Sequence, residues 1–101
     1  MIVNRRTFNV KPTEVDAAIE WLQQEIAQEQ ARGPLPGKTR VYVTSIGTFS
    51  QVAMEAEFED LAAYDQFWTT WFSRPECQAA NTKFTKLLRG GGANEIWALI
   101  E

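Results

Sequence analysis

The pattern of hydrophobic and polar positions predicts four strands. In QVAMEAEFE, residues 51–59, hydrophobic side chains recur at every second position, and this period is typical of a strand with one buried face. The side chains on the apolar side are Val52, Met54, Ala56 and Phe58. Three further segments rich in β-branched and aromatic residues are predicted as strands, namely IVNRRTFNV (2–10), RVYVTSIGT (40–48) and NEIWALIE (94–101).

A helical period separates the first two of these strands. From Val15, within KPTEVD, hydrophobic residues recur at spacings of one, three and four, which predicts an amphipathic helix with a solvated Gln- and Glu-rich face. They are Val15, Ala18, Ile19, Leu22 and Ile26. We expect Thr13 to cap this helix, with Asp16 in the second place of a variant capping box. RGPLPGK, residues 32–38, holds two Gly and two Pro and predicts a loop.

The second helical region is predicted to contain two helices that meet at Pro75. Asp60 is a candidate cap for the first, whose apolar positions are Leu61, Tyr64, Trp68 and Trp71. Proline lacks an N–H and suits the first turn of a new helix better than the middle of an old one. The apolar positions of that second helix are Cys77, Ala80, Phe84 and Leu87. GGG, residues 90–92, predicts a flexible break before the last strand.

The order of these elements predicts one α+β domain over residues 1–101, a ferredoxin-like βαββαβ sandwich with a helix pair in its second crossover. Split crossovers place both helical regions on the same face of the sheet. The strands also carry Val41, Val43, Trp97 and Leu99, so the sheet needs cover on both faces. We therefore expect a homodimer that pairs through its sheets into an α+β barrel, with a large apolar interface.

Composition narrows the functions that the chain can have. The net charge of -3 and the scattered basic residues argue against a nucleic-acid partner. The chain has no histidine and a single cysteine, Cys77, so we expect no metal, no other cofactor and no histidine-based catalysis. The place of Cys77 in an apolar stripe indicates burial. No segment approaches a membrane span or a signal peptide, so we expect a cytoplasmic protein without a membrane partner.

Three carboxylates line one side of the third predicted strand: Glu55, Glu57 and Glu59. A metal site would need further ligands from other elements. In a ferredoxin-like sheet this strand lies beside the first, where Arg5 could pair with one glutamate across the ladder. We interpret the row as ion-pairing, or as part of a polar barrel lumen, rather than as metal-binding.

EFEDLAAYDQFWTTWFSRPECQAANTKF, residues 57–84, resembles a recurring passage of the dimeric α+β barrel superfamily. The shared features are a strand that ends in an aromatic residue, an acidic helix start, and a tryptophan before a Ser/Asp-Pro-Glu-type break. The order of elements extends the resemblance over nearly the whole chain. Two branches of the superfamily match, the NIPSNAP-like proteins and the antibiotic-biosynthesis monooxygenases, which include haem-degrading enzymes.

The haem-degrading members imply an expectation for individual residues. They resemble this chain in an Asn-Arg pair on the first strand and in a tryptophan followed by a helix that bears AA. In them the asparagine and the tryptophan shape the pocket, and a histidine after AA binds the haem iron. The positions here are Asn4, Trp71 and Asn81. Because an amide is a poor iron ligand and the chain has no histidine, we do not expect haem degradation.

Two functional hypotheses follow from this resemblance and from the residue types. In the first, a homodimer binds a small, largely apolar or aromatic molecule between sheet and helices, through Asn4, Arg6, Trp68, Trp71 and Asn81. In the second, the protein is a cofactor-independent monooxygenase acting on an aromatic polyketide-like substrate, with Asn4, Arg6 and Asn81 as catalytic candidates because amides and guanidinium groups stabilise an enolate. The alternatives without a ligand are core packing or a dimer interface for the tryptophans and a solvated helix surface for Asn81. For Asn4 and Arg6 the alternative is a position near the sheet edge from which they reach water. An RNA-recognition domain with the same strand order is disfavoured by the acidic third strand.

Overall fold

The computed structural model describes residues 1–100, and it has the predicted α+β architecture. Four strands form one antiparallel sheet in the order β2-β3-β1-β4, the strand order of a ferredoxin-like fold. Their bounds are β1 Ile2–Asn9, β2 Thr39–Val43, β3 Gln51–Phe58 and β4 Ala93–Ala98.

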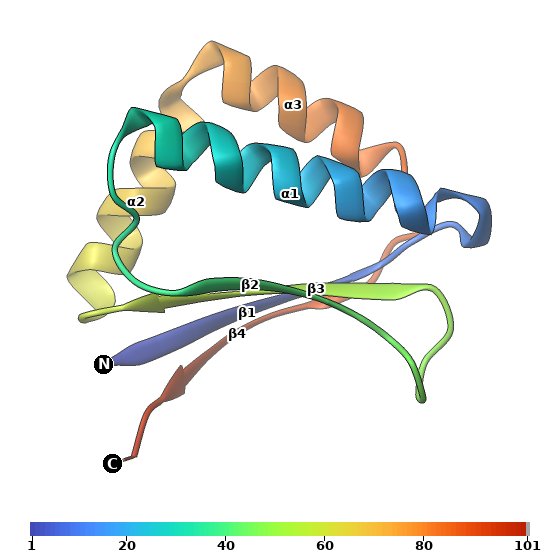
Figure 1. Cartoon of the computed structure of the whole chain (residues 1–101), viewed down its shortest axis with the longest axis horizontal. Helices are drawn as coiled ribbons and strands as arrows, with labels where there is room; N and C mark the ends of the chain where they lie inside the picture. The colour runs from blue at the N-terminus through green and yellow to red at the C-terminus, as the bar shows by residue number, and fades with distance from the viewer. Residues whose placement is uncertain (101) are drawn as a thin grey trace.

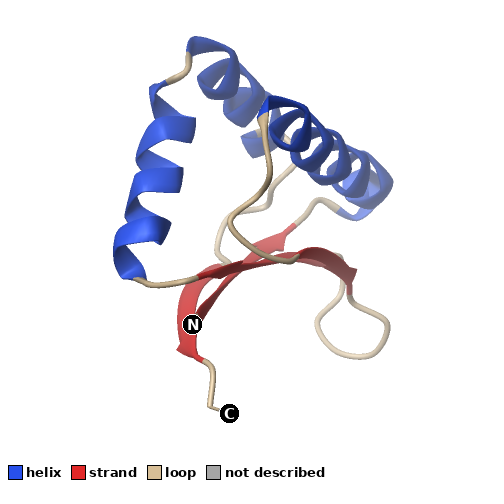
Figure 2. Ribbon diagram, turned by 60° about the vertical axis from the view of Figure 1, so that its left-hand side comes forward, coloured by secondary structure: helices blue, strands red, loops and turns tan. Residues whose placement is uncertain are grey.

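All the helices lie on one face of this sheet (Figure 1). Helix α1, Val15–Arg32, follows a short 3-10 turn, η1, at Pro12–Glu14, and helix α3, Pro75–Thr85, runs beside it. Helix α2, Leu61–Ser73, rises from one end of the sheet (Figure 2). The opposite face carries no helix, and both the β2–β3 loop and the C-terminal end hang on that side.

The core between sheet and helices confirms both apolar patterns seen in the sequence. Burial alternates along β3 without exception, and the four buried residues are Val52, Met54, Ala56 and Phe58. On α1, Ala18 and Leu22 are buried. The other members of the predicted stripe pack against the core, namely Val15, Ile19 and Ile26. Because the period of each element matches the face it buries, sheet and helix pack without a register conflict.

The sheet face without helices carries a row of alternating charges. In the strand register, Arg40, Glu55, Arg5 and Glu95 lie side by side, in that order from β2 to β4. Arg5 Nη2 lies 2.5 Å from Glu55 Oε2, which confirms the predicted ion pair across the ladder.

This face is less apolar than predicted. Val41 and Val43 pair with buried positions of β3, so they lie on the helix side of the sheet. Trp97 lies on the open face and is 54% exposed, and Leu99 follows the end of β4. The open face therefore mixes charges with a few large apolar side chains.

The start of α1 differs from the prediction. Thr13 lies inside the 3-10 turn and makes no capping hydrogen bond, and Glu14 occupies the N-cap position of α1 without a side-chain cap. Pro12 explains the difference, because proline fixes φ and lacks an N–H, which favours the first position of a helical turn. The turn thus begins at Pro12, its N-cap is Lys11, and Thr13 lies two residues too late to cap it.

Two strands, β2 and β4, end several residues before their predicted limits, whereas β1 and β3 each end one residue early. β2 ends at Val43 rather than at residue 48, and Thr44 N–H donates to the carbonyl oxygen of Gln51 at 3.0 Å to close the loop. Ile46 and Phe49 project from this loop and are 98% and 89% exposed. β4 ends at Ala98, and the last residue of its predicted range, 101, lies outside the described residues.

The break between α2 and α3 falls where Pro75 predicts it. A residue before proline is disfavoured in the helical region, and Arg74 has φ −83° and ψ 126°. α2 therefore ends at Ser73, and α3 starts at Pro75, the first residue with helical geometry after the break.

Asp60 caps α2 as predicted, since its Oδ1 accepts a hydrogen bond from Ala63 N–H at 2.8 Å. We expect Asp60→Ala to lower the free energy of unfolding by about 1 kcal/mol, the usual cost of losing an N-cap. Urea denaturation followed by tryptophan fluorescence measures this loss. Thr13→Ala is the matched control, because Thr13 caps nothing, and an equal loss there would contradict the assignment of the caps.

Candidate functional site

A cavity of about 100 Å³ lies between the sheet and helices α1 and α2. Met54 and Ala56 form part of its floor, and Leu35, from the connection between α1 and β2, borders it. Figure 2 shows this connection crossing in front of the space between α2 and α1. The aromatic side chains around the cavity are Phe8, Trp21, Phe67, Trp68, Trp71, Phe72 and Phe84.

These aromatic rings support one another, so the cavity wall is a packed unit. The ring centroids of Trp68 and Trp71 are 5.9 Å apart and those of Trp71 and Phe72 are 4.9 Å apart, both in edge-to-face geometry. Trp21 stacks on Phe84 with centroids 4.2 Å apart. Trp21 also donates its Nε1–H to the carbonyl oxygen of Ala80 at 3.0 Å, which ties α1 to α3. A wall made of mutually packed rings is pre-formed for an apolar ligand.

Asn4 is fully buried on β1, and its amide has all its hydrogen bonds satisfied. Nδ2 donates to Asn94 Oδ1 at 2.7 Å and to the carbonyl oxygen of Glu95 at 3.0 Å. Oδ1 accepts from Arg6 Nε and from Trp68 Nε1, both at 3.2 Å. One amide therefore fixes the position of a cation and of an aromatic ring on the cavity wall.

Arg6 brings a positive charge to the floor of this cavity. Its Cζ lies 3.9 Å from the ring centroid of Trp68, and its Nη2 lies 3.5 Å from the hydroxyl oxygen of Tyr64. No carboxylate among residues 1–100 forms an ion pair with it. Burial lowers the pKa of the Arg6 guanidinium, which nevertheless stays charged because an arginine side chain does not deprotonate in proteins.

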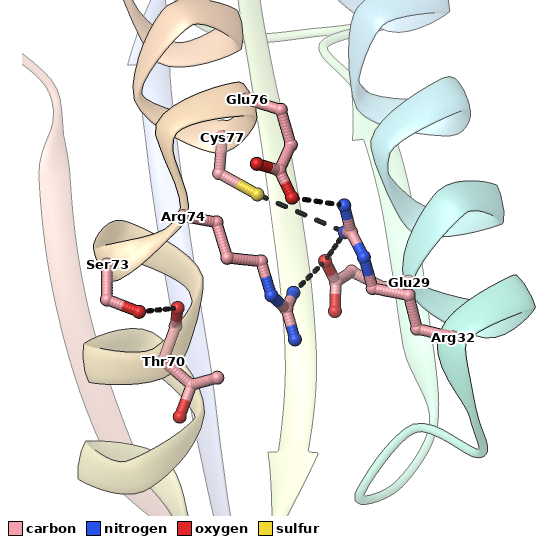
Figure 3. Close-up of polar contacts among 7 residues, drawn as sticks. All are labelled: Glu29, Arg32, Thr70, Ser73, Arg74, Glu76 and Cys77. Atoms are coloured by element: carbon pink, nitrogen blue, oxygen red, sulfur yellow. Dashed lines mark hydrogen bonds and ion pairs between the residues drawn. The ribbon is translucent and has the colours of Figure 1, made fainter.

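Two carboxylates border the cavity from α1. Glu29 is neutralised by two arginines, since its Oε1 lies 2.5 Å from Arg32 Nη1 and 2.8 Å from Arg74 Nη1 (Figure 3). Glu25 has no such partner among the described residues. Burial raises the pKa of the Glu25 carboxyl, and the nearby charge of Glu29 raises it further.

The Glu29 cluster holds the end of α1 against the corner between α2 and α3. Arg32 Nη2 also lies 3.1 Å from Glu76 Oε1, and Arg32 Nη1 lies 3.9 Å from Cys77 Sγ (Figure 3). Cys77 is 1% exposed, which confirms its predicted burial. The same view shows Ser73 Oγ donating to the carbonyl oxygen of Thr70 at 2.6 Å, in the last turn of α2. This corner keeps the aromatic wall of α2 in place.

The structure brings the predicted site residues together, with one of them behind the others. Arg6, Trp68, Trp71 and Asn81 border the cavity, whereas Asn4 lies behind Arg6 and Trp68 and does not. The side chain of Asn81 makes no hydrogen bond within residues 1–100, so its amide is free to bind a ligand.

The sequence analysis did not identify several other residues that contribute to the site. Tyr64 was placed only in an apolar stripe, yet its hydroxyl oxygen accepts from Asn94 Nδ2 at 3.3 Å as well as from Arg6. Asn94 lies opposite Arg6 in the β1–β4 register, a signal that becomes available once the strand order is known. Trp21 lies three residues after Ala18 of the predicted stripe, and this spacing could have identified it. No sequence signal identifies Leu35.

The described residues contain neither a group of side chains suited to a metal ion nor a helix suited to span a membrane. In the described part of the chain, no three His, Cys, Asp or Glu side chains are grouped so that they could hold a metal ion. Over the same residues, no helix combines the length and the apolar character needed to cross a membrane.

Comparison with known proteins places the fold. The family model for NIPSNAP matches residues 3–91. A NIPSNAP family protein from Agrobacterium tumefaciens is 21% identical, over 99% of this chain and 86% of that one, with a TM-score of 0.83. An uncharacterised NIPSNAP-like domain protein from Burkholderia xenovorans is 23% identical, over 98% of this chain and 84% of that one, with a TM-score of 0.81.

The other branch is also represented among similar structures. An antibiotic biosynthesis monooxygenase is 14% identical over the whole of both chains, with a TM-score of 0.76. At such identities the likeness shows a common fold alone. None of the curated protein sequences matches the chain.

Proposed function

Because this chain belongs to the NIPSNAP family, and its fold is shared with an antibiotic biosynthesis monooxygenase, we propose that it is a homodimer that binds a small, largely apolar or aromatic molecule. The binding site is the cavity between sheet and helices. The observation that carries this proposal is an aromatic cavity bordered by two polar side chains, Arg6, which has no carboxylate partner among residues 1–100, and Asn81. Pockets of this composition, apolar with a few polar groups, are typical of small-molecule sites.

The volume of the cavity limits the size of the ligand. An apolar cavity of about 150 Å³ holds benzene, whereas pockets for drug-sized ligands measure about 300–1,000 Å³. At about 100 Å³, this cavity is smaller than the one that holds benzene, so a ligand of one ring or a short branched chain would extend toward its mouth. A polycyclic molecule would require Leu35 or Phe72, which border the cavity, to move.

The dimer in this proposal forms through the open face of the sheet. That face exposes Trp97 and Tyr42, and the β2–β3 loop, which carries the exposed Ile46 and Phe49, hangs on the same side (Figures 1 and 2). A second copy would cover these side chains together with the charges of the strands. The proposal keeps the expected cytoplasmic location.

Native mass spectrometry combined with a binding titration tests the proposal. We expect a dimer of the fresh protein, and quenching of tryptophan fluorescence by one-ring probes such as phenol, because tryptophans line the cavity. Ala56→Leu should fill the cavity floor and weaken phenol binding at least about tenfold, while leaving a folded protein.

Ala62→Leu is the control for this experiment, because Ala62 is exposed on α2 and does not border the cavity. Equal binding by the Ala56→Leu and control proteins would show that the probe binds elsewhere. A monomer at all accessible concentrations would contradict the dimer but not the binding site.

A second candidate function is cofactor-independent oxygenation of an aromatic substrate. The donors of Arg6 and Asn81 face one apolar cavity, where they could stabilise an enolate better than water does. If this function holds, Trp71→Phe combined with Asn81→Ala abolishes oxygen consumption with the bound ligand under air. For a binding protein the same double change alters affinity only.

A further inference from the structure

Arg6 is partly buried and has no carboxylate partner in the described residues. Among residues 1–100, Arg5, Arg32, Arg40 and Arg74 each lie within 4.0 Å of a carboxylate oxygen. Arg89 does not, but it is exposed and donates to the carbonyl oxygens of Val10 and Phe49. Arg6, which borders an apolar cavity, contacts an amide, a hydroxyl and an aromatic ring instead. A cation removed from water without a counter-ion is costly for a protein to maintain. Its persistence here calls for a negative partner that residues 1–100 do not supply.

The guanidinium is held so that one end of it remains free. One face lies on the ring of Trp68, Nε donates to Asn4, and Nη2 makes one long contact with Tyr64. Both N–H groups of Nη1 and one of Nη2 have no partner in the described chain. Two parallel N–H groups are what a carboxylate needs for bidentate binding to arginine.

The surroundings of Arg6 also fix its orientation before any ligand arrives. Asn4 accepts from both Arg6 and Trp68, and Asn4 is itself held by two bonds to β4. A cation fixed in this way loses little conformational freedom on binding, which raises affinity for a matching anion. Asn4 thus acts as a positioning residue for the anion site.

From this arrangement we propose that the ligand of the cavity is a monoanion, a carboxylate on an apolar body of about one ring, and that Arg6 selects it. This inference rests on the proposed function of the cavity. A dianionic phosphate ester fits poorly, because among the described residues the cavity offers one cation, and Glu25 also borders it without a cationic partner.

Two carboxylates on α1, Glu25 and Glu29, border the cavity and repel this anion, but the repulsion from each differs in strength. Glu29 is neutralised by Arg32 and Arg74. Glu25 borders the cavity without a cationic partner in the described residues, so its negative charge should weaken the binding of an anion. Removing that charge should therefore favour the anionic ligand and leave an uncharged one unaffected.

Benzoate and benzamide test the inference, because they share one ring and differ in charge. We expect calorimetric titration of the wild-type protein to show benzoate binding at least about tenfold more tightly than benzamide. Arg6→Gln should remove this preference by weakening benzoate alone, and Arg6→Lys should retain part of it. Glu25→Gln should strengthen benzoate several-fold without changing benzamide.

The outcomes separate this inference from the proposal on which it rests. Equal affinity of the wild-type protein for the two compounds would overturn the anion site while leaving an apolar binding cavity. Loss of both compounds in Ala56→Leu, with their preference intact in the wild-type protein, would support both. Failure of both compounds and of phenol to bind would overturn the cavity as a binding site.

Discussion

Replacing Asn4 with leucine is expected to lower the free energy of unfolding by about 3–5 kcal/mol. Asn4 is fully buried, and leucine of similar size would leave its hydrogen-bonding partners unsatisfied. These partners are Arg6 Nε, Trp68 Nε1, Asn94 Oδ1 and the carbonyl oxygen of Glu95. A buried polar group left without its partner costs about 1–3 kcal/mol, so the losses together form a large effect. Urea denaturation at two protein concentrations measures it and separates folding from association.

Asn9→Leu is the control on the same strand. Asn9 also uses its amide, accepting from Gln51 at 3.0 Å and donating to the carbonyl oxygen of Gly90 at 3.4 Å, but it lies at a partly exposed strand end. Water can replace these bonds, so we expect a loss of about 1 kcal/mol or less. If the two substitutions cost the same, the buried network around Asn4 does not stabilise the fold as described.

Gly92→Ala is expected to cost about 3 kcal/mol or more, because two penalties coincide at this glycine. Gly92 has φ +104°, which a side chain rarely adopts, and an added Cβ would overlap the carbonyl oxygen of Thr7. Thr7 pairs with Ala93, the first residue of β4, so relief of the overlap must pull the two strands apart. Thermal denaturation and amide hydrogen exchange in β4 measure the damage.

Gly90→Ala separates the two penalties. Gly90 also has a positive φ, +96°, but an added Cβ there would meet no atom within 4 Å. We expect a loss of about 1–2 kcal/mol from the backbone conformation alone. Equal losses at both glycines would contradict the close approach of Gly92 to Thr7. The three glycines, predicted from the sequence as a flexible break, thus include one that the structure requires for strand pairing.

The fold could be predicted where a local pattern and the tertiary packing agree. The alternation of β3, the stripe of α1, the cap at Asp60 and the break at Pro75 all follow from short stretches of sequence. The prediction failed at Thr13, where Pro12 starts a turn upstream. It also failed at the end of β2, because strand length depends on where the neighbouring strand provides partners.

Part of the candidate site could also be predicted, because there too a local pattern agrees with the tertiary packing. Asn4 and Arg6 were predicted to serve a site between sheet and helices, and both lie on the helix side of β1. The bonds from Asn94 to Asn4 and Tyr64 depend on which residues of β1 and β4 face each other. That register arises from long-range pairing, which a hydrophobic pattern does not specify in an exposed strand such as β4.

The row of charges on the open sheet face also has a symmetry of its own. It reads positive, negative, positive, negative from Arg40 through Glu55 and Arg5 to Glu95, so its sign reverses when it is read backwards. If a second copy packs on this face about a two-fold axis parallel to the strands, the rows of the two copies run in opposite directions. Arg40 of each copy then lies opposite Glu95 of the other, and Glu55 lies opposite Arg5. A two-fold axis parallel to the row would instead place each charge opposite the same residue of the other copy, and therefore opposite a charge of the same sign. The face therefore distinguishes between two rotational settings of a second copy, and attraction favours only the first.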